Sequence, residues 1–201
     1  MYSIVRIIIG FLLLSVPMVL VAKSKARHKQ RRVVGCVLLA LAITIVLSFV
    51  PFENAIVTFP SAESAARYYD MKFSNTQEVV EGLECDMVVA RKSKNSYSQT
   101  LVPKTNEGWK IGLGTDIKII SQKTTENATI TVYGHQKLSD RFIWIKYMDD
   151  EEPIIAHSIQ TEFVVLQKEE LGDLYLSVYC ANITQTTEAY RVYINGKEIA
   201  V

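Results

Sequence analysis

The first fifty residues contain no aspartate or glutamate, although the chain of 201 residues has 21 of these acids. Seven of the 22 lysines and arginines lie in this acid-free part, so residues 51–201 carry 15 basic and 21 acidic side chains. The formal net charge of +1 therefore combines a basic N-terminal part with an acidic remainder of net charge −6. An acidic domain lacks the positive surface that holds a phosphate backbone, so we expect no nucleic acid as a partner.

Histidine is also scarce, since the chain has three, and this excludes a histidine-rich metal site. Ser158, His157 and Asp140 could form a catalytic set, but no G-x-S-x-G nucleophile elbow accompanies them, and we expect no catalysis by His157 or His135. The acids Asp149–Glu152 could offer oxygen ligands to Ca²⁺. The spaced D-x-D-x-D-G pattern is missing, so we interpret them as a solvated turn. The sequence therefore predicts no catalytic residue, no metal site and no cofactor.

Two long apolar runs dominate the N-terminal part. The second, VVGCVLLALAITIVLSFV, has eighteen residues without a charge and is typical of a transmembrane helix. The first has sixteen residues, from Ile7 to Ala22, and reaches spanning length if it begins near Ile4. A cleaved signal peptide that ends at Ala22 is the alternative for this run. We expect a two-helix transmembrane hairpin with spans at about 4–22 and 33–50, so that residues 1–50 form a membrane unit.

The loop between these runs, KSKARHKQRR, is strongly basic. An excess of lysine and arginine in a short loop keeps that loop in the cytoplasm, so both termini are predicted to be extracytoplasmic in a two-pass protein of the cell membrane. The loop would also contact anionic headgroups of the lipid bilayer. The residues that carry both predictions are Lys23, Lys25, Arg27, Lys29, Arg31 and Arg32.

Beyond a juxtamembrane linker at 51–59, we expect an extracytoplasmic β-rich domain at 60–201. It begins with one short helix, which Ser61 can cap and which ends near Tyr69. Short runs of β-branched and aromatic residues then alternate with turn signals, of which Asn195-Gly196 is the strongest. The pattern predicts an antiparallel meander or sandwich. The expected strands are 78–81, 85–91, 96–102, 109–111, 116–121, 129–135, 141–147, 153–159, 163–167, 174–181, 190–194 and 198–201.

A weak internal repeat accompanies this pattern. An offset of 46 residues places ITVYGHQ over LSVYCAN and Tyr147 over Tyr193. The repeat could record a duplicated β-meander, or it could be a chance alignment of similar hairpins.

Several segments together resemble a known group of proteins. PFENAIVTF followed by SAESAARYY, the strand CDMVVARK, the element GWKI and the later hairpins with a VY pair are similar to uncharacterised small two-pass membrane proteins of Gram-positive-type bacteria with an extracytoplasmic β-rich domain. The resemblance covers most of the chain and implies this architecture. It implies no activity.

Two cysteines, Cys85 and Cys180, lie in the predicted domain, whereas Cys36 lies within the second apolar run. Strand alternation places Cys85 on one face with Met87, and Cys180 on one face with Val178, so both thiols should point into the core. A disulfide between them and a pair of buried free thiols are both compatible with this placement.

Two classes of function remain. The first is a membrane-anchored binding, sensing or scaffolding module, whose edge strands or tyrosine-rich surfaces contact an envelope protein or polymer. The second is a cell-envelope enzyme, hydrolase-like, that uses surface carboxylates. A pair of acids with raised pKa values in one pocket would indicate the enzyme. Because no catalytic motif is present, the sequence favours the binding module.

Overall fold

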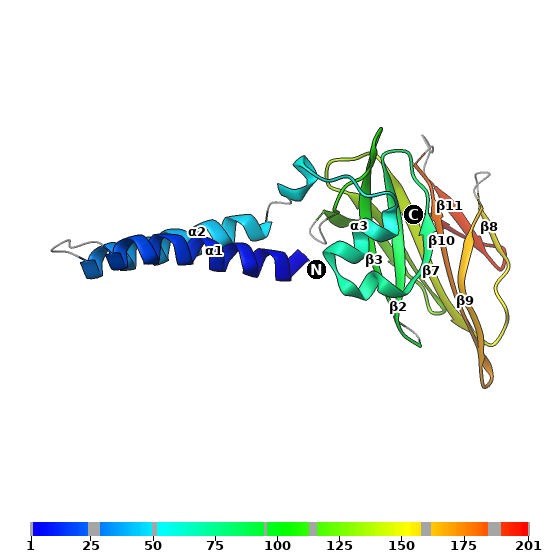
Figure 1. Ribbon diagram of the computed structural model, residues 1–201. Helices are drawn as coiled ribbons and strands as arrows, with labels where there is room; N and C mark the ends of the chain where they lie inside the picture. The colour runs from blue at the N-terminus through cyan, green and yellow to red at the C-terminus, as the bar shows by residue number, and fades with distance from the viewer. Residues whose placement is uncertain are drawn as a thin grey trace.

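The computed structural model describes residues 2–23, 29–49, 52–94, 96–112, 116–157, 162–184 and 190–200. Two long helices, α1 (Tyr2–Lys23) and α2 (Lys29–Phe49), lie side by side and project from a β domain (Figure 1). Two short 3-10 helices, η1 (Phe52–Ala55) and η2 (Met71–Asn75), flank the helix α3 (Ala62–Tyr69).

The prediction of a two-helix transmembrane hairpin is wrong. Within the part of the chain that the structure describes, no helix is both long enough and apolar enough to cross a membrane. The helices include charge, because α2 begins with KQRR and α1 contains Arg6 and Lys23. Within the helices, the uncharged apolar runs have sixteen residues in α1, at 7–22, and seventeen in α2, at 33–49. At about 1.5 Å per residue these runs fall short of a hydrocarbon layer of about 30 Å.

The predicted location depended on these two transmembrane spans. The prediction of a two-pass protein of the cell membrane, with both termini extracytoplasmic, is therefore also wrong. Of the basic residues predicted to fix the topology, Lys25 and Arg27 lie outside the described residues. The large apolar side chains described on α1 and α2 are mostly exposed, among them Ile8, Phe11, Leu38 and Leu39.

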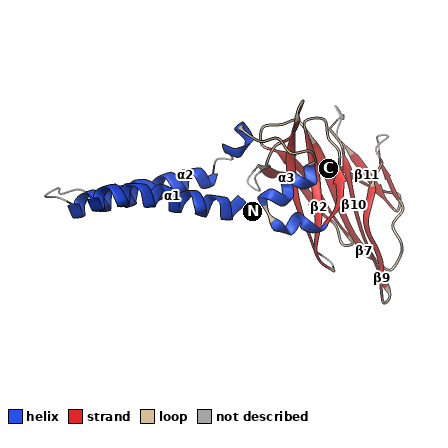
Figure 2. Cartoon of the chain, viewed as in Figure 1, coloured by secondary structure: helices blue, strands red, loops and turns tan. Residues whose placement is uncertain are grey.

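The strands of the described residues are antiparallel, as the alternation of apolar residues predicts, and they form three sheets (Figure 2). Each of the twelve predicted strands has a counterpart among the described residues, with ends that differ by a few residues, while the predicted positions 158, 159 and 201 lie outside them. The first sheet has the order β1-β2-β3-β4, the second β5-β6-β7-β10-β9 and the third β12-β11-β8. Their bounds are β1 Thr76–Val80, β2 Cys85–Ser93, β3 Ser96–Thr105, β4 Gly108–Trp109, β5 Ile117–Thr124, β6 Ala128–His135, β7 Arg141–Asp149, β8 Ile155–His157, β9 Val164–Leu171, β10 Leu174–Asn182, β11 Arg191–Ile194 and β12 Lys197–Ala200.

Helix α3 covers the outer face of the first sheet (Figure 1). Ser61 caps it as predicted, because the Ser61 Oγ accepts a hydrogen bond from the Ser64 backbone N at 3.2 Å. Its small alanines allow close approach to the sheet. The resulting core consists of Ala62, Ala65, Ala66, Phe73, Val88, Ala90 and Val102.

The first and second sheets pack face to face around another core. Alternation along β2 directs Met87 toward the second sheet and Val88 toward α3, so both faces of this strand are buried. The members of the core between the sheets are Val80, Cys85, Met87, Val89, Leu101, Phe142, Leu166, Val178 and Cys180.

The opposite face of the second sheet packs against the third sheet. Ile143 and Ile145 of β7 point to this side, whereas their neighbour Phe142 points to the first sheet. The domain is therefore layered as helix, sheet, sheet, sheet (Figure 1). The central core residues of this last layer are Ile130, Val132, Ile143, Ile145, Tyr179, Ala181, Val192, Ile194 and Ile199.

The two cysteines of the β domain meet the expectation for their placement. Cys85 and Cys180 are both 0% exposed and belong to the same core, but both are free thiols. Cys180 instead contacts a thioether, with its Sγ 3.7 Å from the Sδ of Met87. Burial raises the pKa of the Cys180 thiol to about 12, so it is an unreactive core residue.

The two sequence blocks that are related by the offset of 46 residues differ in how their strands pair. β6 pairs with β7, but β10 pairs with β7 and β9, while β11 belongs to the third sheet. Chance alignment of similar hairpins is therefore the better account of the 46-residue offset.

Candidate functional site: the hairpin cavity

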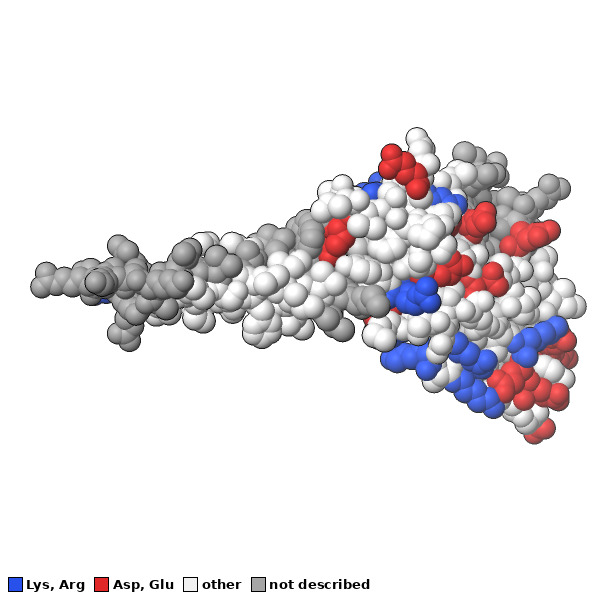
Figure 3. All heavy atoms as spheres, viewed as in Figure 1, with Lys and Arg blue, Asp and Glu red and all other residues white. Residues whose placement is uncertain are grey.

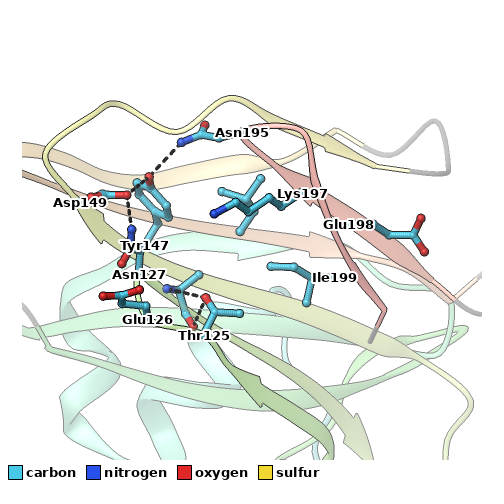
Figure 4. A pocket seen from close by; sticks show the side chains of 11 residues that line it. Thr125, Glu126, Asn127, Tyr147, Asp149, Asn195, Lys197, Glu198 and Ile199 are labelled. Carbon is cyan, nitrogen blue, oxygen red and sulfur yellow. Dashed lines mark hydrogen bonds between the residues drawn. The ribbon is translucent and has the colours of Figure 1, made fainter.

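A cavity of about 250 Å³ opens between the ends of the second and third sheets (Figure 4). We call it the hairpin cavity, because the β11–β12 hairpin forms one of its walls. Its lining comprises the β5–β6 turn at Thr125–Ala128, Tyr147 and Asp149 of β7, and Ile194, Asn195 and Lys197–Ile199 of the hairpin. Segments far apart in the sequence thus supply one site.

The hairpin wall depends on the predicted Asn195-Gly196 turn. Both residues have positive φ angles, of 50° and 76°, which asparagine and glycine tolerate best. Asn195 also ties the turn to the chain before β8, since its backbone N donates to the Ile154 O at 3.0 Å and its side-chain Oδ1 accepts from the Ile154 N at 2.8 Å. Two hydrogen bonds between Asn195 and Ile154 therefore hold the turn against the chain before β8.

A chain of hydrogen bonds fixes the polar side of the cavity (Figure 4). The Tyr147 hydroxyl donates to the Asp149 Oδ2 at 2.7 Å and accepts from the Asn195 Nδ2 at 3.0 Å. The Asn127 amide also donates to Asp149, and the Asp150 backbone N donates to its Oδ1 at 2.9 Å. The network holds a carboxylate in place from three separate segments.

The ionisation states in this network follow from these contacts. Burial, and then the hydrogen bond to Asp149, raise the pKa of Tyr147 to about 12. The same hydrogen bond is the largest cause that lowers the pKa of Asp149 below its usual value. At neutral pH the phenol is therefore neutral and the carboxylate is charged.

The other walls differ in character. Ala128, Ile194 and Ile199 belong to the buried core and give an apolar floor. In Figure 4, the Lys197 side chain extends into the cavity, whereas Glu198 points away from it. Glu198 instead accepts from the Tyr193 hydroxyl at 3.3 Å. The cavity thus presents an ammonium and a fixed carboxylate above an apolar base.

The run Asp149–Glu152 was predicted to be a solvated turn, and the structure separates its members. The Asp149 side chain belongs to the hydrogen-bond network of the cavity, whereas Asp150 and Glu151 are exposed. Among the described residues, no group of three or more potential ligands could hold a metal ion. The alternation of Tyr147 and Asp149 on one face of β7 is the signal that could have found this part of the site.

Asp140 has a structural role in the described part of the chain. It is 0% exposed, and its oxygens accept hydrogen bonds from the backbone N atoms of Leu83, Glu84 and Cys85 and from the Thr184 hydroxyl, at 2.7 to 3.0 Å. Ser158 lies outside the described residues, and so does the side chain of His157. In the hypothetical catalytic set of Ser158, His157 and Asp140, the carboxylate of Asp140 therefore already accepts hydrogen bonds from the fold itself.

His135 is buried, with 5% of its surface exposed. Its Nδ1 accepts from the Lys137 backbone N at 3.1 Å, and its Nε2 lies 3.9 Å from an Asp116 oxygen. Burial lowers the pKa of His135, so the imidazole is neutral at pH 7. It does not line the hairpin cavity.

Comparisons with known proteins found no matching family model, no matching curated protein and no matching solved structure. The resemblance drawn from the sequence segments stays a prediction.

Proposed function

We propose that the β domain is a binding module whose ligand occupies the hairpin cavity. The observation that carries this proposal is the network of Tyr147, Asp149 and Asn195, which fixes a carboxylate in the wall of a cavity that Lys197 also lines. Fixed polar groups above an apolar floor are the usual composition of a small-molecule site.

The charges of the lining favour a particular ligand chemistry. A ligand amine would pair with the Asp149 carboxylate, and a ligand carboxylate or hydroxyl would pair with Lys197. Ile194 and Ile199 would contact an apolar part between these two ends. We therefore favour a small zwitterion, such as a short peptide or an amino acid, over an anion or an apolar molecule.

The same groups support binding rather than catalysis. An acid that donates a proton at neutral pH needs a raised pKa, whereas the pKa of Asp149 is lowered. Because the pKa of Tyr147 is raised to about 12, its hydroxyl keeps its proton at neutral pH. The hydroxyl donates a hydrogen bond to Asp149 without transferring the proton.

Calorimetric titration of the full chain with glycylglycine, with ethylamine and with acetate tests the proposal. We expect the dipeptide to bind more tightly than either half-ligand, because only it satisfies both charged walls. Lys197→Met should weaken dipeptide binding about tenfold, the effect of one lost hydrogen bond to a charge. Lys146→Met, on the exposed face of β7, is the control and should bind as the native chain does. No heat of binding with any probe, or equal binding by both variants, would contradict the proposal.

Tyr147→Phe provides a second prediction, on stability. The variant loses the donor to Asp149 and the acceptor for Asn195, so the free energy of unfolding should fall by about 1–3 kcal/mol. The pKa of Asp149 should rise toward its usual value, because its largest lowering cause is removed. Urea denaturation and carboxyl NMR titration measure the two effects. Tyr193→Phe removes a more exposed bond to Glu198 and should change stability by less than about 1 kcal/mol.

A further inference from the structure

A second hollow lies on the opposite side of the domain, between η2 and the β2–β3 hairpin. It consists of two adjoining parts, of about 360 Å³ and about 180 Å³, which share Lys72 and Ser98. Thr100 lines the larger part and Lys92 the smaller. We call the two parts together the η2 groove.

Thr100 is the first observation that points to a ligand here. Only 2% of this residue is exposed, and its Oγ1 has no hydrogen-bond partner. A buried hydroxyl without a partner destabilises the folded chain. Alternation along β3 places Thr100 on the same face as Ser98, toward η2 and away from the second sheet. The side chain that carries this unpaired hydroxyl therefore lies at the wall of the larger part of the groove.

The charge of the groove is the second observation. Lys72, Arg91 and Lys92 line it, and Asp70 is the one acid among the described residues that do so. This excess of positive charge contrasts with the net charge of −6 for residues 51–201. In Figure 3, basic side chains gather along the same edge of the domain, below β2 and β3.

Two of the cations are already oriented by the protein. The guanidinium of Arg91 donates to the backbone O of Lys94 at 2.8 Å, which fixes it against the turn of the hairpin. The Lys72 Nζ lies 2.9 Å from the Asp70 Oδ2, at the rim of the larger part. Lys92 is exposed and lines the smaller part, so its ammonium is open to a ligand.

We propose that the η2 groove binds a phosphate group, with the Thr100 hydroxyl donating to one phosphate oxygen and Lys72 and Lys92 neutralising its charge. A phosphate offers several acceptor oxygens at once, which suits a hydroxyl at the base and ammonium groups at the rim. The group could belong to a free phosphate ester or to a lipid headgroup, and the chemistry of recognition is the same. This site is independent of the hairpin cavity.

Thr100→Val tests the proposal, because valine has the shape of threonine without its hydroxyl. The variant should unfold at higher urea concentration than the native chain, since an unsatisfied buried group is removed. Its affinity for inorganic phosphate should fall about tenfold, measured by titration of the full chain at low ionic strength.

Ser177→Ala is the matched control. Ser177 is 0% exposed and its hydroxyl also has no partner, but it lies between the second and third sheets. This variant should gain stability in the same way and bind phosphate unchanged. Lys92→Met should weaken phosphate binding, whereas Lys146→Met should not.

Two arms distinguish the sources of the phosphate group. In one, the full chain is titrated with glycerol phosphate; in the other, it is sedimented with phosphatidylcholine vesicles that contain phosphatidic acid. Binding that Thr100→Val weakens in the first arm supports a free ester, and such an effect in the vesicle arm alone supports a headgroup. Phosphate binding that is absent in all arms, or equal in the native chain and in Thr100→Val, overturns the proposal.

Discussion

Asp140→Asn is expected to lower the free energy of unfolding by about 3–5 kcal/mol. The carboxylate that this change removes is fully buried and accepts three backbone N–H groups and the Thr184 hydroxyl. Asparagine keeps the shape of the side chain, but it turns an NH₂ group toward donors that need an acceptor. The Asp140 carboxylate joins three segments: the loop between β1 and β2, the start of β7 and the segment after β10. The substitution would remove the hydrogen bonds that connect them.

The surroundings leave little room for an alternative arrangement. A Cβ atom at Gly82 would lie 2.8 Å from the Asp140 Oδ2 and 2.1 Å from the Cys85 O. The backbone at Gly82 therefore already lies close to the carboxylate, and a residue with a side chain would not fit there. Glu84→Gln is the control, because Glu84 binds Ser139 through an exposed carboxylate and the change should have a much smaller effect on stability than Asp140→Asn.

The effect of Asp140→Asn should depend on pH with a defined sign. Burial alone would raise the pKa of Asp140, but the N–H groups of Leu83, Glu84 and Cys85 and the Thr184 hydroxyl hold it below its usual value. A lowered pKa in the folded state contributes stability above the unfolded pKa of about 3.9, and this stability is lost as the pH falls through the folded pKa. The difference between native chain and variant should therefore be constant at neutral pH and shrink below about pH 4. Urea denaturation across this range measures it, and a difference that grows toward low pH would contradict the assignment.

Phe142→Ala is the second change with a large expected effect, again about 3–5 kcal/mol. Phe142 is 0% exposed and fills the space between the first and second sheets, in the same core as Met87 and Val178. Truncation to alanine removes most of a ring that contacts both sheets, and strands paired on either side restrict collapse around the void.

The control for Phe142→Ala is a truncation at the surface. Ile119 of the edge strand β5 is 56% exposed, so Ile119→Ala should cost less than about 0.5 kcal/mol. Thermal or urea unfolding of the full chain compares the two. A loss at Phe142 no greater than that at Ile119 would show that the two sheets do not pack as one core.

Local patterns were sufficient to predict the elements of the β domain. Alternating β-branched and aromatic residues identified each strand, Ser61 marked the start of α3, and Asn195-Gly196 marked a hairpin turn. These signals act between residues close in sequence, so a single chain reveals them. The two N-terminal helices show the weakness of such signals, because apolar runs near spanning length predicted a membrane hairpin that the structure contradicts.

Apart from the alternation of Tyr147 and Asp149 along β7, the sites depend on contacts between residues distant in sequence, which no local pattern encodes. Asp149 stood in an acidic run that was interpreted as a solvated turn, yet its partner Asn127 comes from another hairpin. Thr100 resembles any other threonine of a strand until the fold buries its hydroxyl beside η2. Likewise, alternation showed which face Cys180 occupies, but only the packing of the sheets brought Met87 against it.

The sheet that contains β7 and β10 lies between two others, and this has a consequence for hydrogen–deuterium exchange. Both strands are paired on each side and covered on both faces, so solvent can reach their amides only when the layers separate. The slowest-exchanging amides should therefore be those of Ile143, Ile145, Val178 and Cys180, with a free energy of opening equal to that of global unfolding. The amides of the edge strand β5 should exchange orders of magnitude sooner, so one exchange map would show the layering of the domain in solution.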